Sequence, residues 1–170
     1  MAFLPNDAGA LRLCVDLVDR EAPVRGPVPV VTEDGRVPSG RLLGTVGVEY
    51  LDRRDGEWWP IVRLPAVYLA TGSYAELEER LRELVGGGIP GFAWQSGEDA
   101  ALGLQIGPAE PPGEGFVVEV GVDLSAFLAE AGGGRSRPGS ALALFRFATS
   151  RPAAVAFADA LRREGGQLLG

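Results

Sequence analysis

The side chains that most often perform chemistry in proteins are scarce in this sequence. Its 170 residues contain no histidine and no lysine, and Cys14 is the one cysteine. The chain therefore has no Ser-His-Asp triad, no histidine or cysteine zinc site, and no Schiff-base or Walker A lysine. A lone cysteine in an apolar strand is typical of an inert core thiol. We expect no cofactor, no metal and no enzymatic activity.

Carboxylates are the remaining side chains that could act in catalysis. Glu119 and Asp123 share one face of an expected strand, but four residues separate them by about 13 Å, too far to act as a pair on their own. Other acids, such as Asp52 and Asp55, fall in expected turns, where aspartate favours the turn geometry. A hydrolase whose carboxylates come together only in the fold stays an alternative.

Charge restricts the class of partner. The formal net charge is −7, which argues against a general nucleic-acid or anionic-membrane binder because phosphate binding needs positive charge. A basic protein partner is compatible with it. The N-terminal stretch has neither a basic segment nor a long apolar run, and no segment approaches about 18 consecutive apolar residues. We expect no membrane span and a cytoplasmic location.

The clearest element is a helix over residues 73–86. Ser73 is placed to cap its first turn, and Glu76 can reach back to the Ser73 N–H in a capping box. Glycines 86–88 predict its end because glycine adopts the left-handed conformation at little cost. An apolar stripe at helical spacing predicts packing on one side, and it consists of Tyr74, Leu77, Leu81, Leu84 and Val85.

A second helix is predicted over residues 151–164. Pro152 suits its first turn, and Gly165-Gly166 are expected to stop it. Both helices follow an apolar strand through a short Ala-Thr-Ser connection, at residues 69–73 and 147–150. One interpretation is an internal β-β-α duplication. The other is that any strand–turn–helix unit needs a cap at its start and a glycine at its end.

Strands account for most of the remaining chain. Alternation of apolar and polar residues predicts strands at 10–18 and 116–124. Asp55-Gly56 predicts a hairpin between residues 41–51 and 57–69. Further strands are expected at 91–95 and 101–106, which could pair with one another, and at 141–148. That last stretch is apolar on both faces, so it predicts an interior strand, while Pro65 predicts a break or bulge in the strand of residues 57–69.

These elements predict a single α+β domain over residues 1–170, with a largely antiparallel sheet and the two helices on one side. Residues 21–40 contain four prolines and are read as a proline-rich arm or loop. Residues 107–115 and 131–139 are read as flexible loops.

Tryptophans are the strongest candidates for contact with a partner. Trp58 and Trp59 are adjacent on an expected strand and therefore point to opposite faces. We expect one in the core and the other exposed at an interface or covered by the proline-rich arm. By residue type, the candidate partner-binding residues are Trp58, Trp59, Trp94, Glu119 and Asp123.

The order of elements resembles a known bacterial family. A tryptophan-bearing strand leads into the helix that ends at Gly88, and the strand Leu144–Ser150 leads into the C-terminal helix. Over residues 42–169 this layout is similar to WapI-type immunity proteins and their uncharacterised relatives, although Pro65 departs from the family pattern. The resemblance implies binding of a polymorphic toxin and implies no catalytic residue.

The function that we expect is non-enzymatic protein binding. An immunity protein would occlude a basic toxin domain, with acidic groups speeding association and exposed aromatic side chains anchoring the contact. One alternative is a self-assembling structural protein, a homo-oligomer in which the proline-rich arm swaps onto a neighbour. The other is the carboxylate hydrolase described above.

Overall fold

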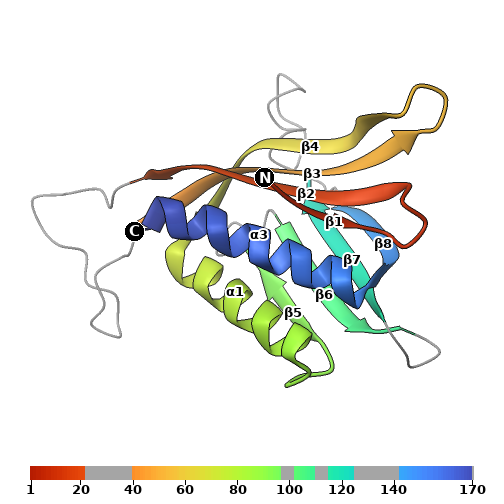
Figure 1. Ribbon diagram of the computed structural model, residues 1–170. Helices are drawn as coiled ribbons and strands as arrows, with labels where there is room; N and C mark the ends of the chain where they lie inside the picture. The colour runs from red at the N-terminus through yellow and green to blue at the C-terminus, as the bar shows by residue number, and fades with distance from the viewer. Residues whose placement is uncertain (22–39, 97–101, 110–114, 125–141, 170) are drawn as a thin grey trace, which may run out of the picture.

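In the described part of the chain, a series of four strands and a helix occurs twice (Figure 1). The computed structural model describes residues 1–21, 40–96, 102–109, 115–124 and 142–169. Sheet 1 contains β1 (Ala2–Pro5), β2 (Leu11–Glu21), β3 (Arg41–Asp52) and β4 (Glu57–Ala70), and α1 (Thr71–Gly86) follows it. Sheet 2 contains β5 (Phe92–Gln95), β6 (Leu102–Pro108), β7 (Gly115–Asp123) and β8 (Leu142–Ser150), and α3 (Arg151–Leu169) follows it.

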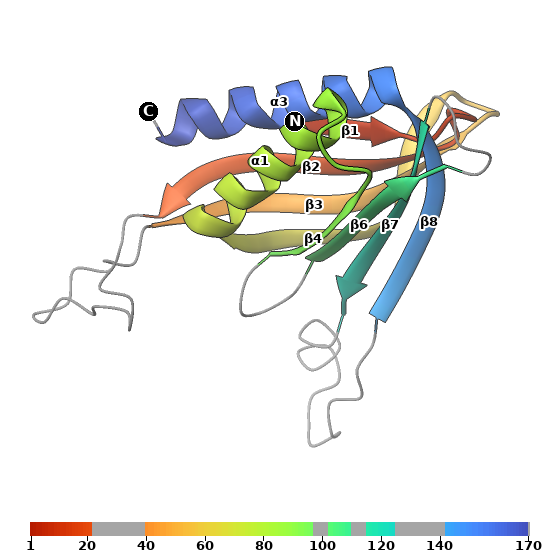
Figure 2. The ribbon, with the colours of Figure 1, turned by 90° about the horizontal axis from the view of Figure 1, so that it is seen from below.

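The predicted α+β class is confirmed, with one change in its architecture. Every strand pair among the described residues is antiparallel, but these strands form two four-stranded sheets where the sequence predicted one. Figure 2 shows the strands of sheet 2 running obliquely to those of sheet 1. The repeated unit has four strands before each helix, twice the number in the duplication that the sequence suggested. The short strand β1 was missed because its four residues carry too little alternation.

Local signals in sheet 1 were read correctly. The hairpin between β3 and β4 turns at Asp55-Gly56, and Gly56 has φ 75°, a left-handed conformation that favours glycine. Further along β4, the register with β3 shifts between the pairs Gly44–Val67 and Val46–Leu64. Pro65 lies inside this shift, so the predicted bulge is confirmed.

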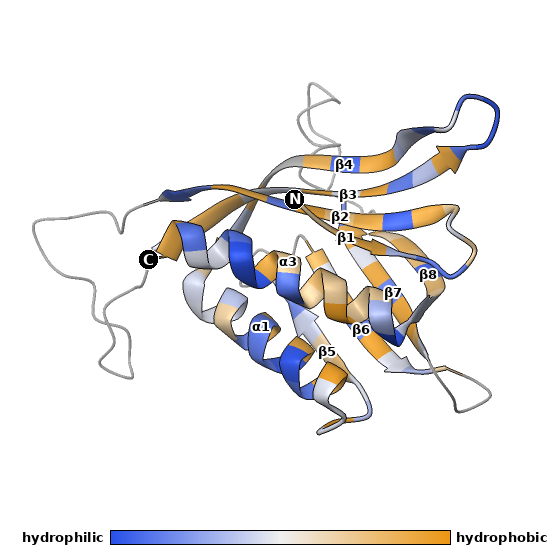
Figure 3. Cartoon of the chain, in the orientation of Figure 1, coloured by the Kyte–Doolittle hydropathy of each residue, from blue (hydrophilic) through white to orange (hydrophobic). Residues whose placement is uncertain are grey.

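Helix α3 covers the sheet that it does not follow in sequence. It packs against β1 and β2 of sheet 1 and against α1 (Figure 2). Its buried face, which includes Phe157 and Leu161, joins one continuous core with the inward residues of both sheets. Figure 3 shows hydrophobic and hydrophilic residues alternating along the strands, as sheets with one buried face require. Each half of the chain therefore completes its core with residues of the other.

The start of α1 differs from the prediction. The helix begins at Thr71, two residues before Ser73, and no side chain caps it, so the Ser73–Glu76 capping box is wrong. The predicted end is confirmed: Gly87 is left-handed at φ 79°, and the Gly87 and Gly88 N–H groups donate to the last carbonyls of the helix.

The end of α3 also differs. The helix continues through Gly165-Gly166 to Leu169, where the sequence placed its end at residue 164. Gly165 is buried, and a Cβ added there would lie 2.0 Å from the Tyr74 hydroxyl of α1. This glycine allows two helices to approach each other closely and does not act as a stop signal.

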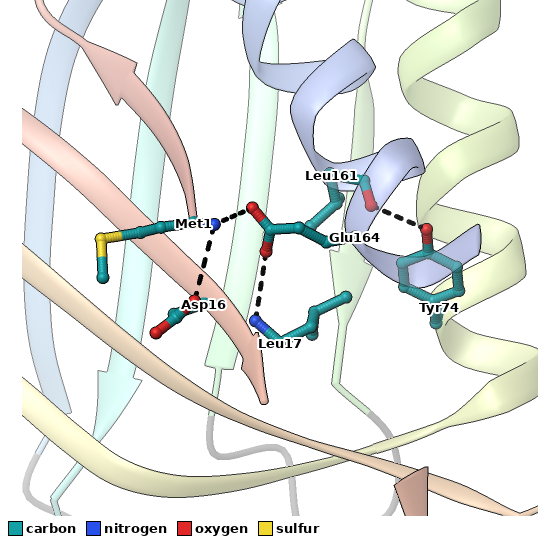
Figure 4. A network of polar contacts seen from close by, with 6 residues as sticks. All are labelled: Met1, Asp16, Leu17, Tyr74, Leu161 and Glu164. Atoms are coloured by element: carbon teal, nitrogen blue, oxygen red, sulfur yellow. Dashed lines mark hydrogen bonds and ion pairs between the residues drawn. The ribbon is translucent and has the colours of Figure 1, made fainter. Parts of the chain in front are cut away.

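Polar contacts attach α3 to its neighbours (Figure 4). The Glu164 carboxylate accepts from the Leu17 N–H of β2 at 3.2 Å and pairs with the Met1 amino group, which also lies 3.5 Å from Asp16. The Tyr74 hydroxyl donates to the Leu161 carbonyl at 3.0 Å. Each contact joins residues that are distant in sequence, so none could be predicted from local spacing.

Several expectations fall outside the described residues. They concern the proline-rich arm, of which only Glu21 and Gly40 are described, and the loop 131–139. Of the expected loop 107–115, Gly107 and Pro108 belong to β6 and Gly115 begins β7.

Candidate protein-binding surface

The two faces of sheet 2 differ in what covers them. Alternate residues of its strands, such as Leu104 and Val120, point into the core. The residues between them form the outer face, and the strand register aligns them in rows. One row is Gln95, Gly103, Gly121 and Leu144, and the next is Ala93, Gln105, Glu119 and Arg146.

A hollow of about 630 Å³ lies on this outer face. Gly103 of β6 and Gly121 of β7 are direct cross-strand partners, and their missing side chains leave space where neighbouring rows have bulk. Helix α1 contributes Glu76 to the lining. The other residues that line it are Ala93, Trp94, Gln95, Leu104, Gln105, Glu119, Leu142 and Leu144.

Two leucines of β8 stand beside the hollow without cover from the described residues. Leu142 is 65% exposed and Leu144 is 62% exposed, more than any other large hydrophobic side chain in the described ranges. Both lean toward Gly121, since a Cβ there would lie 3.6 Å from Leu142 Cδ1 and 4.0 Å from Leu144 Cδ1. The hollow thus combines a glycine floor with an apolar border.

These leucines correct the prediction for residues 141–148. Apolar residues on both faces predicted an interior strand, yet β8 is an edge strand that pairs with β7 alone within the described part of the chain. Only one of its faces enters the core, through residues such as Phe147. Both faces of β8 are apolar, as the sequence indicated, but the face that carries Leu142 and Leu144 points out of the molecule.

The charged candidates of β7 lie on the same outer face, as the alternation predicted. Glu119 lies opposite Arg146 and Asp123 lies opposite Leu142. The Glu119 carboxylate is 3.6 Å from the Arg146 guanidinium, which is itself 68% exposed. An ion pair this exposed adds little to stability. It partly neutralises the acidic outer face that the sequence suggested, although the charged residues that line the hollow itself, Glu76 and Glu119, are both acidic.

Trp94 is a correction to the candidate list. Its side chain is 4% exposed, and its indole N–H donates to the Ser73 carbonyl of α1 at 2.7 Å. The tryptophan therefore ties β5 to the first turn of α1, and only a small part of its side chain reaches the hollow.

Trp58 and Trp59 point to opposite faces of β4. The half-buried Trp58 ring lies 4.0 Å from the guanidinium of Arg12, which also lies 4.0 Å from the Phe3 ring and pairs with Glu49 at 2.7 Å. This stack gives Trp58 a structural role. Trp59 is 48% exposed, in sheet 1 opposite Tyr50, and lines no part of the hollow. The structure therefore separates the candidate residues into two surfaces.

Within the described ranges, no group of three or more His, Cys, Asp or Glu side chains is arranged to hold a metal ion. Cys14 is buried, and its burial raises the pKa of the thiol to about 11, so it stays protonated near neutral pH. Neither α1 nor α3 is long and apolar enough to cross a membrane.

Comparisons with protein families, curated proteins and solved structures gave no match to this chain. The resemblance to WapI-type immunity proteins and the functional expectations drawn from it stay predictions. The outer face of sheet 2 combines the hollow with Leu142 and Leu144, the two most exposed large hydrophobic side chains of the described residues.

Proposed function

We propose that this protein is a non-enzymatic protein-binding module and that the outer face of sheet 2 is its contact surface. One observation carries the proposal: Leu142 and Leu144, each more than 60% exposed, border a hollow floored by Gly103 and Gly121.

This arrangement has the parts that a protein contact needs. Apolar side chains gathered around a depression are typical of interaction sites, whereas single exposed apolar residues need no explanation. A depression of this size can accept a large side chain from a partner, and well-packed anchors of that kind contribute most of the free energy of binding. Gln95, Gln105 and the Glu119–Arg146 pair supply hydrogen-bonding groups around the apolar part.

The partner that we propose is a basic protein. The net charge of −7 favours encounter with a positively charged surface, and such steering weakens as salt screens it. A toxin domain, which the resemblance to immunity proteins implies, would be one such partner. Binding by occlusion requires no catalytic residue of this chain.

The hollow can be filled without disturbing the fold. A Cβ at Gly103 would meet no atom closer than 4.0 Å, and valine is well suited to a strand. Gly107 is the matched control, since it lies in the same strand, has no atom within 4 Å of an added Cβ and does not line the hollow. We therefore compare affinity capture from the source cell by the wild-type chain, Gly103→Val and Gly107→Val.

We expect one stoichiometric basic protein to be captured by the wild-type chain and Gly107→Val, lost with Gly103→Val, and released by high salt. Thermal unfolding of all three chains shows that each is folded. Equal capture by Gly103→Val, or no partner with any chain, would contradict the proposal.

A further inference from the structure

One side of β8 pairs with β7, and we call the opposite side its free side. A hydrogen bond at Ala148 shows which residues of β8 direct their backbone N–H and C=O groups to this free side. The Asp7 N–H donates to the Ala148 carbonyl at 2.9 Å, so the backbone groups of Ala148 point away from β7. The register between β7 and β8 runs without a shift from Gly115–Ser150 to Asp123–Leu142. In an antiparallel strand, alternate residues direct both their N–H and their C=O to the same side. Leu142, Leu144 and Arg146 therefore present their backbone groups to the free side of β8.

Part of this edge is already closed by the chain itself. The turn after β1 supplies the Asp7 contact, and the Thr149 hydroxyl donates to the Pro5 carbonyl at 2.7 Å. Among the described residues, the stretch from Leu142 to Arg146 has no strand on that side. The centre of this open stretch is Leu144.

We infer that this edge pairs with the same edge of a second copy of the chain. Antiparallel pairing about a two-fold axis at Leu144 sets Leu144 against Leu144, and Leu142 of each copy against Arg146 of the other. Three such hydrogen-bonded pairs form about six backbone hydrogen bonds. Sheet 2 of one copy then continues into sheet 2 of the other as a single sheet. This pairing removes an exposed strand edge, which would otherwise be prone to uncontrolled association.

The side chains of the edge are self-complementary in this arrangement. Both Leu144 side chains lie on the outer face at the axis and cover one another.

This inference goes beyond the proposed function and does not depend on it. The dimer keeps the outer face of each sheet 2 open, so two hollows would flank a central group of leucines. Purified protein alone tests the dimer, whereas the partner is needed to test the hollow. Failure of either proposal is therefore recognised separately.

Engineered cysteines test the register directly. A hydrogen-bonded antiparallel pair has Cα atoms about 5.5 Å apart, within the range of a disulfide, so Leu144→Cys should cross-link to itself. Leu142→Cys is the matched control, because its side chain is similarly exposed but its counterpart in the second copy lies about 13 Å away along the strand. Cys14 is buried and is kept in both variants.

On mild oxidation of the purified chains, we expect a disulfide-linked dimer of Leu144→Cys on a non-reducing gel and monomer for Leu142→Cys. Sedimentation should show wild-type dimer and Leu144→Ala dimer. Leu144→Pro should be a folded monomer, because proline removes an N–H that points away from β7. Equal cross-linking of both cysteine variants, cross-linking of neither, or a wild-type chain that stays monomeric at high micromolar concentration would overturn the inference.

Discussion

The contact between α1 and α3 depends on Gly165 of α3, which lies against Tyr74 of α1. Glycine often marks the end of a helix, yet Gly165 lies inside α3. Glycine is needed at this position because Tyr74 occupies the space that a side chain would fill. Sequence periodicity on α3 alone cannot reveal this, because the residue that demands the glycine is on α1.

We predict opposite effects from alanine at two adjacent positions. Gly165→Ala should lower the free energy of unfolding by about 1–3 kcal/mol or more, because its Cβ overlaps the Tyr74 ring. Gly166→Ala should raise it by about 0.5–1 kcal/mol, because that position has no atom within 4 Å and alanine favours a helix. Denaturant unfolding measures both, and equal effects would show that the close approach of the helices is not required.

Tyr74 also predicts a dependence of stability on alkaline pH. Burial, followed by the nearby Glu78 and Glu164 carboxylates, raises the pKa of its phenol from 10 to about 12. The unfolded state then releases this proton at lower pH than the folded state, so the stabilisation present below pH 10 is lost between pH 10 and 12.

Tyr74→Phe tests this dependence. It should cost about 1 kcal/mol at neutral pH, because the Leu161 carbonyl loses its donor, and it should show a weaker decline above pH 10. If the stability of Tyr74→Phe declines above pH 10 as steeply as that of the wild-type chain, then other groups cause the decline.

Among the helices and strands, the sequence predicted the features that depend on residues adjacent in the chain. The Asp-Gly hairpin of β3 and β4, the alternation of β7, the glycine end of α1 and the bulge at Pro65 are all determined by residues adjacent in the chain. The position of β8 at an edge, and the contact of α3 with the first sheet, depend on residues distant in sequence and were not predicted.

The adjacent tryptophans of β4 should differ in their contribution to stability. Trp58→Ala should lower the free energy of unfolding by about 1–3 kcal/mol, since it removes the ring on which Arg12 stacks. Trp59→Ala should cost about 0.2–1 kcal/mol, the range of a cross-strand pair, here with Tyr50. Urea unfolding of both variants checks this, and a larger loss with Trp59→Ala would contradict the structural role of the Trp58–Arg12 stack.

In the molecule as a whole, two repeated units share one core, and the described residues leave the outer face of sheet 2 uncovered. The candidate list from the sequence included Glu119 and Asp123 of that face but none of its glycines or leucines. The sequence shows that Gly103 and Gly121 occupy outward positions of two predicted strands. Only the pairing register of the strands places these two glycines opposite each other. The apolar second face of β8 was visible too, and it was assigned to the interior because most such strands are buried.

The most direct test of the central claim is partner capture by a folded Leu142→Ser/Leu144→Ser variant. We expect capture to be lost while the free energy of unfolding changes by less than about 1 kcal/mol, because both side chains lie outside the core. Capture equal to that of the wild-type chain would contradict the claim. So would a loss of stability of about 2–5 kcal/mol, because the leucines would then belong to the protein's own core.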